Sequence, residues 1–122
     1  MVKIIKEPSI IEAAGNKKKI IKEFFGNVNS RTSELSLAMM KSPQGWEEPG
    51  QCPEFNEYTL VLKGKLKVTT RNEEMVVSEG EAVMAKKGEW LKYSTPWKGG
   101  AEYIAVCVPA FSPFTVHRED GK

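Results

Sequence analysis

The chain is a succession of short runs of β-branched and aromatic residues, each closed by a turn signal. Such runs are typical of strands, and their even spacing is typical of an antiparallel sandwich or barrel. Glycine marks the turns, as at Gly26-Asn27, Gly64 and Glu79-Gly80. The runs are KIIKE, KKIIKEFFG, ELSLAMMKS, EYTLVLKG, KLKVTTR, EMVVSEG, EAVMAKKG, WLKYSTP and EYIAVCVPAF. The sequence therefore predicts an all-β fold.

One segment, SIIEAAG, departs from this pattern. Ser9 can act as an N-cap, Glu12 follows three residues later as in a capping box, and Gly15 can end a helix. We therefore expect one short N-terminal helix in an otherwise all-β chain.

The length of the chain predicts a single domain. Its 122 residues fall within the usual domain size of about 100 to 150 residues, and no internal repeat, linker or low-complexity tract divides them. We expect N-terminal strands and the helix in residues 1–44, the core of the domain in 45–111, and a C-terminal tail in 112–122.

Charge and hydrophobicity exclude two classes of partner. Eighteen basic and sixteen acidic side chains are interspersed, which argues against a nucleic-acid binder because no basic stripe forms. The cluster Lys17-Lys18-Lys19 is expected to be a solvated edge. No apolar run approaches the roughly 20 residues of a membrane helix, so no membrane partner is expected.

The compartment is predicted from the N-terminus and the cysteines. The first residues, MVKIIKEPSIIEAAG, contain neither a long apolar core nor a small-residue cleavage site, so we expect no signal peptide. Cys52 and Cys107 lie far apart in the sequence and are expected to stay thiols in a reducing compartment. These features predict a cytoplasmic protein.

Period-two alternation assigns faces to the segment 57–62. Glu57, Thr59 and Val61 share one side of a strand, and Tyr58 and Leu60 share the other with Leu62. Glu57 leads the mixed face, and in a small barrel this face can line a cavity. The alternative is that Glu57 lies in solvent at the strand end.

The spacing around this segment resembles the first motif of the cupin superfamily, a family of small jelly-roll β-barrels. That motif places two histidines, a glutamate and a glycine at fixed distances after a leading glycine. The corresponding residues in this chain are Gly45, Gln51, Pro53, Glu57 and Gly64. The glycines and the glutamate are kept, and both histidines are replaced.

A second cupin motif follows at the expected place. It reads glycine, proline, glycine, histidine and asparagine, and here Gly80, Lys86, Gly88, Leu91 and Thr95 stand at those positions. The resemblance implies a cupin-type, RmlC-like jelly roll without its three histidines. The chain also shows a weaker resemblance to two kinds of cupin. The ethanolamine-utilisation Q-type cupins also lack the histidine set, and ectoine synthase has a similar C-terminal sequence. The tail residues that carry the similarity to ectoine synthase are Pro109, Val116, His117, Glu119, Asp120 and Gly121.

The resemblance implies a degenerate metal site. Typical cupins hold a divalent metal with three histidines and the motif glutamate, and only Glu57 and the amide of Gln51 remain here as donors. These two are a poor ligand set for iron, zinc or nickel, so no metal and no other cofactor is expected. A weaker alternative is a substitute site built from Gln51, Glu54, Glu57, Tyr93 or Cys107.

The function predicted from these residues is the binding of a small polar organic molecule, such as a sugar or an amino-acid derivative. A carboxylate buried without a metal has a raised pKa and can anchor an amine or a hydroxyl group. The candidate ligand-binding residues are Trp46, Gln51, Glu57, Tyr93, Tyr103 and His117. Each also has a structural explanation, such as Trp46 as a core residue and His117 as an exposed tail residue.

The alternative function is catalytic. In a small lyase or isomerase Glu57 would act as acid or base with Tyr93 or His117 as its partner, with or without a weakly bound metal. A homodimer is expected in either case, because KKIIKEFFG and ELSLAMM have more apolar surface than one small barrel needs.

Overall fold

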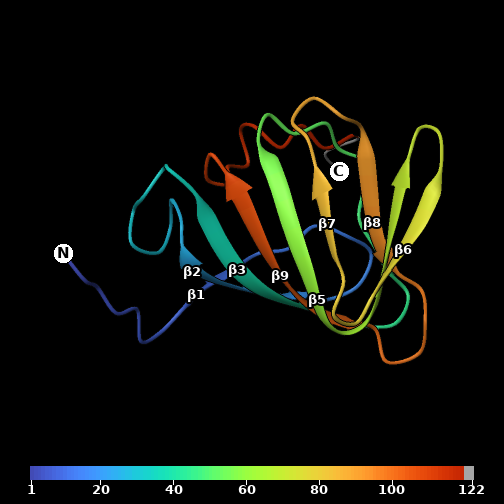
Figure 1. Cartoon of the computed structure of the whole chain (residues 1–122), viewed down its shortest axis with the longest axis horizontal. Helices are drawn as coiled ribbons and strands as arrows, with labels where there is room; N and C mark the ends of the chain where they lie inside the picture. The colour runs from blue at the N-terminus through green and yellow to red at the C-terminus, as the bar shows by residue number, and fades with distance from the viewer. Residues whose placement is uncertain (120–122) are drawn as a thin grey trace.

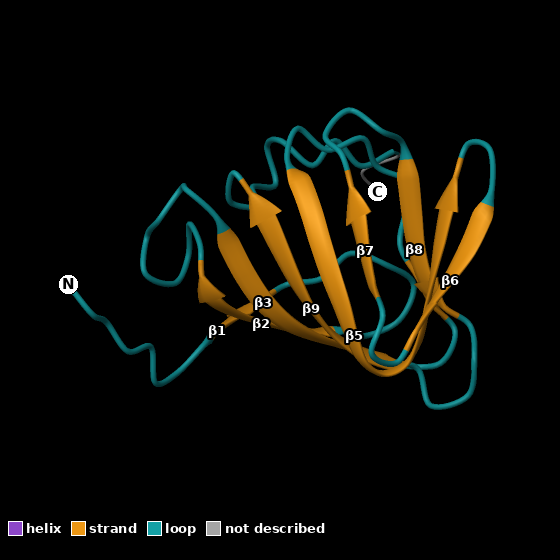
Figure 2. Ribbon diagram, in the orientation of Figure 1, coloured by secondary structure: helices purple, strands orange, loops and turns teal. Residues whose placement is uncertain are grey.

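The computed structural model describes residues 1–119 and shows nine strands and no helix in them (Figure 2). The strands are β1 (Ser9–Ile11), β2 (Ile20–Phe25), β3 (Ser36–Ser42), β4 (Trp46–Glu47), β5 (Asn56–Thr70), β6 (Glu74–Ser78), β7 (Ala82–Ala85), β8 (Leu91–Thr95) and β9 (Ala101–Val108).

All strand pairs are antiparallel, and together they form one curled, half-barrel sheet (Figure 1). The order of the main path is β1-β2-β3-β9-β5-β8-β4, while β6 and β7 also pair with β5. The long strand β5 thus belongs to two halves of the sheet. Its first half pairs with β7 and β9, and its second half pairs with β6 and β8.

The bend in β5 is made by a register shift and a glycine. The pairing with β9 shifts between Val61 and Lys63, and Gly64 follows with a φ of 76°. A side chain at Gly64 would place its Cβ only 2.1 Å from the carbonyl oxygen of Gly100, so this corner requires glycine. Gly64 was expected to end a strand, and it instead turns one continuous strand from one half of the sheet into the other.

The shift at the corner also exchanges the faces of β5. Glu57, Thr59 and Val61 are buried before it, whereas Leu66 and Val68 are buried after it. The inward side therefore changes from odd to even residues, which keeps one interior along the whole bent strand. The expectation that the mixed face of 57–61 points inward is confirmed.

The predicted N-terminal helix is wrong. Ser9–Ile11 is instead β1, which pairs with β2 so that Ser9 faces Glu23 and Ile11 faces Ile21. The helix signals cover only seven residues, and isolated helices of that length are unstable in water. Pairing with the neighbouring strand outweighs them. KIIKE, expected as a strand, also lies outside all strands.

The core lies inside the curl of the sheet. Its largest cluster joins Trp46, Val61, Leu66, Leu91 and Tyr93 with four further buried residues, which are Val68, Val77, Ala101 and Tyr103. A second cluster of Phe55, Cys107 and Val116, packed against Phe111, brings the tail onto the same interior. Within residues 1–119 no helix long and apolar enough to cross a membrane is found.

Candidate functional site

A cavity lies inside the curl, between the two halves of the sheet. Its volume is ≈ 60 Å³, which is room for about five water molecules. The lining combines acidic, basic, phenolic and apolar side chains from many strands. These residues are Ile11, Glu12, Lys19, Ile21, Glu23, Ser36, Ala38, Met40, Glu48, Gln51, Phe55, Glu57, Thr59, Tyr93, Tyr103, Ala105, Cys107, Phe111 and Arg118.

A buried carboxylate and a phenol are paired at this cavity. The hydroxyl of Tyr93 donates a hydrogen bond of 3.1 Å to Oε1 of Glu57. Burial raises the pKa of Glu57, although the bond from Tyr93 and the charge of Lys19 oppose this effect. Burial and the negative charge of Glu57 raise the pKa of Tyr93 well above its ordinary value. Tyr93 therefore stays a neutral donor to Glu57.

A second carboxylate, Glu48, faces the same cavity. Burial raises its pKa from the ordinary 4.5 to about 7, the charge of Lys19 opposes the rise, and the nearby charge of Glu57 adds to it. The backbone N–H of Glu48 donates to the carbonyl of Tyr93 at 3.3 Å, which fixes the backbone of Glu48 beside Tyr93. Carboxylates whose pKa values are raised by burial cluster at functional sites, so the two make this cavity a candidate site.

Glu23 also lines the cavity, but its carboxylate is already used by the fold. Its Oε2 accepts hydrogen bonds from the backbone N–H groups of Val28 and Asn29, at 3.0 and 2.7 Å. Glu23 therefore holds the loop after β2 in place.

Three buried polar atoms are left without a hydrogen-bond partner in the described part of the chain. They are Oε2 of Glu48, Oε1 of Gln51 and Nε of Arg118, and all three residues line the cavity. An unpaired buried polar group costs about 1–3 kcal/mol, and native proteins contain few of them. Three such atoms are therefore concentrated at one cavity, and each can still take a hydrogen-bond partner.

Lys19 supplies a cation to the cavity from the segment that precedes β2. Its Nζ lies 4.1 Å from the ring centre of Trp46 and 5.1 Å from that of Tyr103, within the range of cation–π contacts. Lys17 and Lys18 are exposed as expected, but Lys19 is half-buried and lines the cavity. The prediction of a solvated edge was therefore wrong for Lys19, because its alternation with Ile21 turns it inward.

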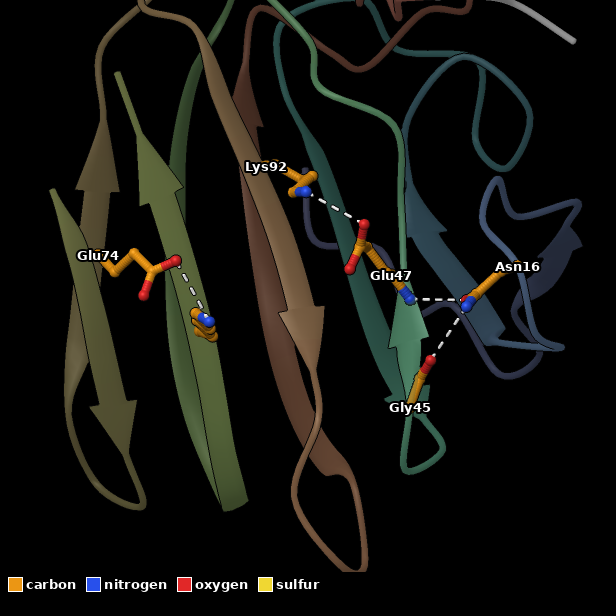
Figure 3. A network of polar contacts seen from close by, with 6 residues as sticks. Asn16, Gly45, Glu47, Glu74 and Lys92 are labelled. Carbon is orange, nitrogen blue, oxygen red and sulfur yellow. Dashed lines mark hydrogen bonds and ion pairs between the residues drawn. The ribbon is translucent and has the colours of Figure 1, made fainter. Parts of the chain in front are cut away.

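Polar contacts on the surface hold the loop before β2 against β4 (Figure 3). The side-chain oxygen of Asn16 accepts a bond of 2.8 Å from the backbone N–H of Glu47, and its amide donates to the carbonyl of Gly45 at 3.2 Å. Lys92 pairs with the carboxylate of Glu47 at 3.1 Å. The two bonds of Asn16 keep the segment that carries Lys19 close to the segment that carries Glu48.

Four of the six predicted ligand-binding residues line the cavity: Gln51, Glu57, Tyr93 and Tyr103. The hydroxyl of Tyr103 shares a hydrogen bond of 2.8 Å with Ser42. Trp46 is buried but does not line the cavity, and its Nε1 donates to the carbonyl of Ala14 at 3.0 Å.

The structure does not bring His117 to the cavity. Its side chain is 51% exposed and pairs with the carboxylate of Glu54 at the surface. The expectation that His117 points at a ligand is therefore corrected, because the tail turns the neighbouring Arg118 inward instead. Asp120 and Gly121, which shared in the tail similarity, lie outside the described residues.

The remaining metal-site candidates do not form a ligand set. Leu91 packs in the core and Pro53 does not line the cavity, so two of the three histidine positions offer no donor. Burial raises the pKa of the Cys107 thiol, which disfavours a thiolate ligand. Within residues 1–119 no group of three or more His, Cys, Asp or Glu side chains could hold a metal. These residues do not fit the histidine-held metal of typical cupins.

Sequence reasoning missed Glu48, Lys19 and Arg118. Alternation could have found Glu48, because it lies two residues after the buried Trp46 and directly follows β4, where period-two spacing puts both on one side. No local signal marks Arg118. Its place depends on an isolated bridge to Gln51, far away in the sequence.

Solved structures share this arrangement of strands. An RmlC-like cupin from Shewanella frigidimarina is 17% identical, with a TM-score of 0.71 over 93% of this chain and 94% of that one. The chain has the fold of the cupin superfamily. The EutQ protein of Clostridium difficile, 24% identical, matches with a TM-score of 0.63 over 75% of this chain and 63% of that one. The cupin resemblance carried by Gly45, Glu57 and Gly64 is thus confirmed for the fold.

One sequence relative is more similar but much longer. The endoribonuclease YbeY of Myxococcus xanthus is 38% identical over 104 residues, which are 85% of this chain and 35% of that protein. The cupin-fold chain thus spans about a third of that relative. No protein-family model matches the chain.

The raised pKa of Glu48 predicts a specific pH dependence of stability. The folded chain holds the Glu48 proton more tightly than the unfolded chain does, so the free energy of unfolding falls as the pH rises from 4.5 to about 7. Above this range the charged group destabilises the fold by about 3 kcal/mol. Glu48→Gln removes this loss, and we expect the variant to exceed the wild type in stability near pH 8 but not below about pH 4.5.

Urea unfolding of both proteins across this pH range measures the effect. Glu47→Gln is the matched control, because Glu47 is exposed beside Glu48 in the sequence, and it should keep the wild-type pH dependence. A stability difference between Glu48→Gln and wild type that does not change with pH would contradict the burial of an ionisable Glu48.

Proposed function

We propose that this cupin-fold chain binds a small polar organic molecule in the cavity that contains Glu48 and Glu57. The observation that carries the proposal is the set of unpaired buried atoms on Glu48, Gln51 and Arg118, all at one cavity. A ligand can pair these atoms and recover the free energy that their burial costs. The apolar part of the lining, including Phe55 and Met40, supplies surface for the body of the ligand.

Glu57 is expected to anchor the ligand together with Tyr93. The pair is buried and pre-positioned, because Glu57 lies on β5 opposite Cys107 of β9 and Tyr93 lies on β8. A fixed carboxylate recognises an amine or hydroxyl group without losing side-chain freedom on binding. No metal is needed in this proposal, and the donor set of Gln51 and Glu57 supports none of the usual cupin metals.

The ribonuclease name of the Myxococcus xanthus relative is not carried over. The chain corresponds to about a third of that protein, and a cavity of ≈ 60 Å³ does not hold a nucleotide. The cytoplasmic location and the lack of a nucleic-acid partner stay predictions from the sequence.

The catalytic alternative has one observation in its favour. The hydroxyl of Tyr93 is in direct hydrogen-bond contact with Glu57, and the nearby carboxylate of Glu48 has a pKa of about 7. A carboxylate with such a pKa can accept or return a proton near neutral pH, as a lyase or isomerase requires. The alternative uses the same binding site, and differs only in that the bound molecule is converted to a product.

A thermal-shift screen of amines, sugars and organic acids tests the binding proposal. A ligand at about 100 times its Kd should raise the Tm by on the order of 10 °C. Glu57→Gln should abolish most of this shift because it removes the anchoring charge. Glu74→Gln, which changes an exposed carboxylate paired with Lys67 (Figure 3), should keep it.

The screen also separates binding from catalysis. If Glu57→Gln still binds a ligand that the wild type converts, but no longer converts it, the catalytic alternative holds. If no compound raises the Tm of the wild type, the binding proposal is refuted.

We further propose that two copies pair through the outer face of the large sheet. Tyr58, Leu60, Met84 and Met39 on this face keep 44%, 41%, 43% and 38% of their area exposed. Tyr58 lies opposite Met84, while Leu60 and Met39 both lie opposite Ile104 of the central β9. The exposed apolar side chains are thus neighbours across four strands, and such a continuous patch is typical of an interface.

Light scattering tests this pairing. The wild type is expected to be a dimer, and Leu60→Lys a monomer because it puts a charge in the middle of the interface. Val76→Lys is the matched control, since Val76 is 48% exposed on β6, away from this face. A monomeric wild type, or a dimeric Leu60→Lys, would remove the claim.

A further inference from the structure

We infer that the ligand is a compact zwitterion, which carries an ammonium group and a carboxylate a few bonds apart. This inference rests on the proposed binding function and names the chemical class of the ligand. It follows from which atoms of the cavity are unpaired, how they are held, and which charged groups surround them.

Two of the unpaired atoms require a hydrogen-bond donor from the ligand. Oε1 of Gln51 is an acceptor, as is Oε2 of Glu48 when ionised. The two residues are only 4% and 6% exposed, so neither side chain can turn to bulk solvent. Their backbones are fixed by bonds to the carbonyls of Leu91 and Tyr93. An ammonium group has three N–H donors, enough to pair both oxygens at once.

The third unpaired atom requires an acceptor. Nε of Arg118 can only donate, and a backbone bridge makes Arg118 the neighbour of Gln51, which carries one of the unpaired acceptors. Guanidinium groups pair best with planar carboxylates. The cavity therefore has its unpaired donor and one unpaired acceptor on bridged residues, which matches a ligand whose own donor and acceptor are close together.

The lining carries charged groups of both signs, with more acidic than basic side chains. Lys19 and Arg118 are basic, and the acidic side chains are Glu12, Glu23, Glu48 and Glu57. A zwitterion adds no net charge, and it can place its ammonium group at Glu48 and its carboxylate at Arg118. An acid alone would add a negative charge to a lining that already has an excess of acidic groups, and an amine alone would leave Nε of Arg118 unpaired.

The size and the apolar lining limit the body of the ligand. A volume of ≈ 60 Å³ has room for a few carbon atoms against Ala38, Met40 and Ala105. A sugar fits less well, because each of its hydroxyl groups would need a polar partner and these three side chains offer none. The cavity thus favours a ligand of amino-acid size.

Isothermal titration of the full chain with matched probes tests the inference. The zwitterions are α-, β- and γ-aminobutyric acid, which differ only in the separation of their charged groups. Propylamine keeps only the ammonium group and butyric acid only the carboxylate. We expect at least one zwitterion to bind about ten-fold or more tighter than both single-charge probes, because each of these probes lacks one of the two charged groups that would pair the unpaired atoms.

Variants test whether the zwitterion binds in this cavity. Glu48→Gln and Gln51→Leu should each weaken binding of the preferred zwitterion by about ten-fold. Glu47→Gln should keep the affinity within about two-fold of the wild-type value. Propylamine or butyric acid binding as tightly as every zwitterion, or unchanged affinity in both cavity variants, would overturn the inference. If the aminobutyric acids fail but another compound from the thermal-shift screen binds, the zwitterion class is wrong and the binding function stands. If nothing in either set binds, both are wrong.

Discussion

The burial of two carboxylates inside a small β fold is the constraint on which the rest of this structure depends. Glu48 and Glu57 lie where burial raises both of their pKa values, and a fold of this size has little stability to give up for such groups. Tyr93, Lys19 and Arg118 partly offset the loss of hydration. The remaining unpaired atoms show that this compensation is incomplete within residues 1–119. A cavity whose buried polar atoms lack hydrogen-bond partners, at a cost in folding stability, is typical of a ligand-binding site.

The curl of the sheet makes such a site available. Because β5 bends at Gly64 and changes its buried face there, one strand contributes Glu57 to the cavity and Leu66 and Val68 to the apolar core. The tail then covers the cavity from the other side, with Arg118 beside Gln51. In typical cupins this interior holds a metal among histidines. Here Gln51 and Glu57 remain at motif positions, and Glu48, Lys19 and Arg118 supply charges that the motif does not encode.

Local sequence patterns predicted the parts of the fold that depend on local chemistry. Period-two alternation put Glu57 on a strand face that could line a cavity, and the glycine spacing indicated the cupin fold. Other predictions were wrong because pairing between distant segments determined the structure there. Ser9–Ile11 has helix signals but forms a strand paired with β2. Gly64 is a residue type that favours turns, but it lies within β5. His117 faces solvent because the tail turns the neighbouring Arg118 toward the cavity. The cavity gathers residues from six strands and the tail, so its composition depends on registers that no single segment determines.

The most direct test of the buried carboxylate site is a titration of the glutamate side chains by carbon NMR, with the two signals of interest assigned by their loss in Glu48→Gln and Glu57→Gln. Both carboxyl groups are expected to titrate with a pKa above the ordinary value of 4.5, with the pKa of Glu48 near 7. If Glu48 and Glu57 instead titrate at the ordinary value of 4.5, the carboxylates are hydrated, and there is no buried polar cavity for a ligand to occupy.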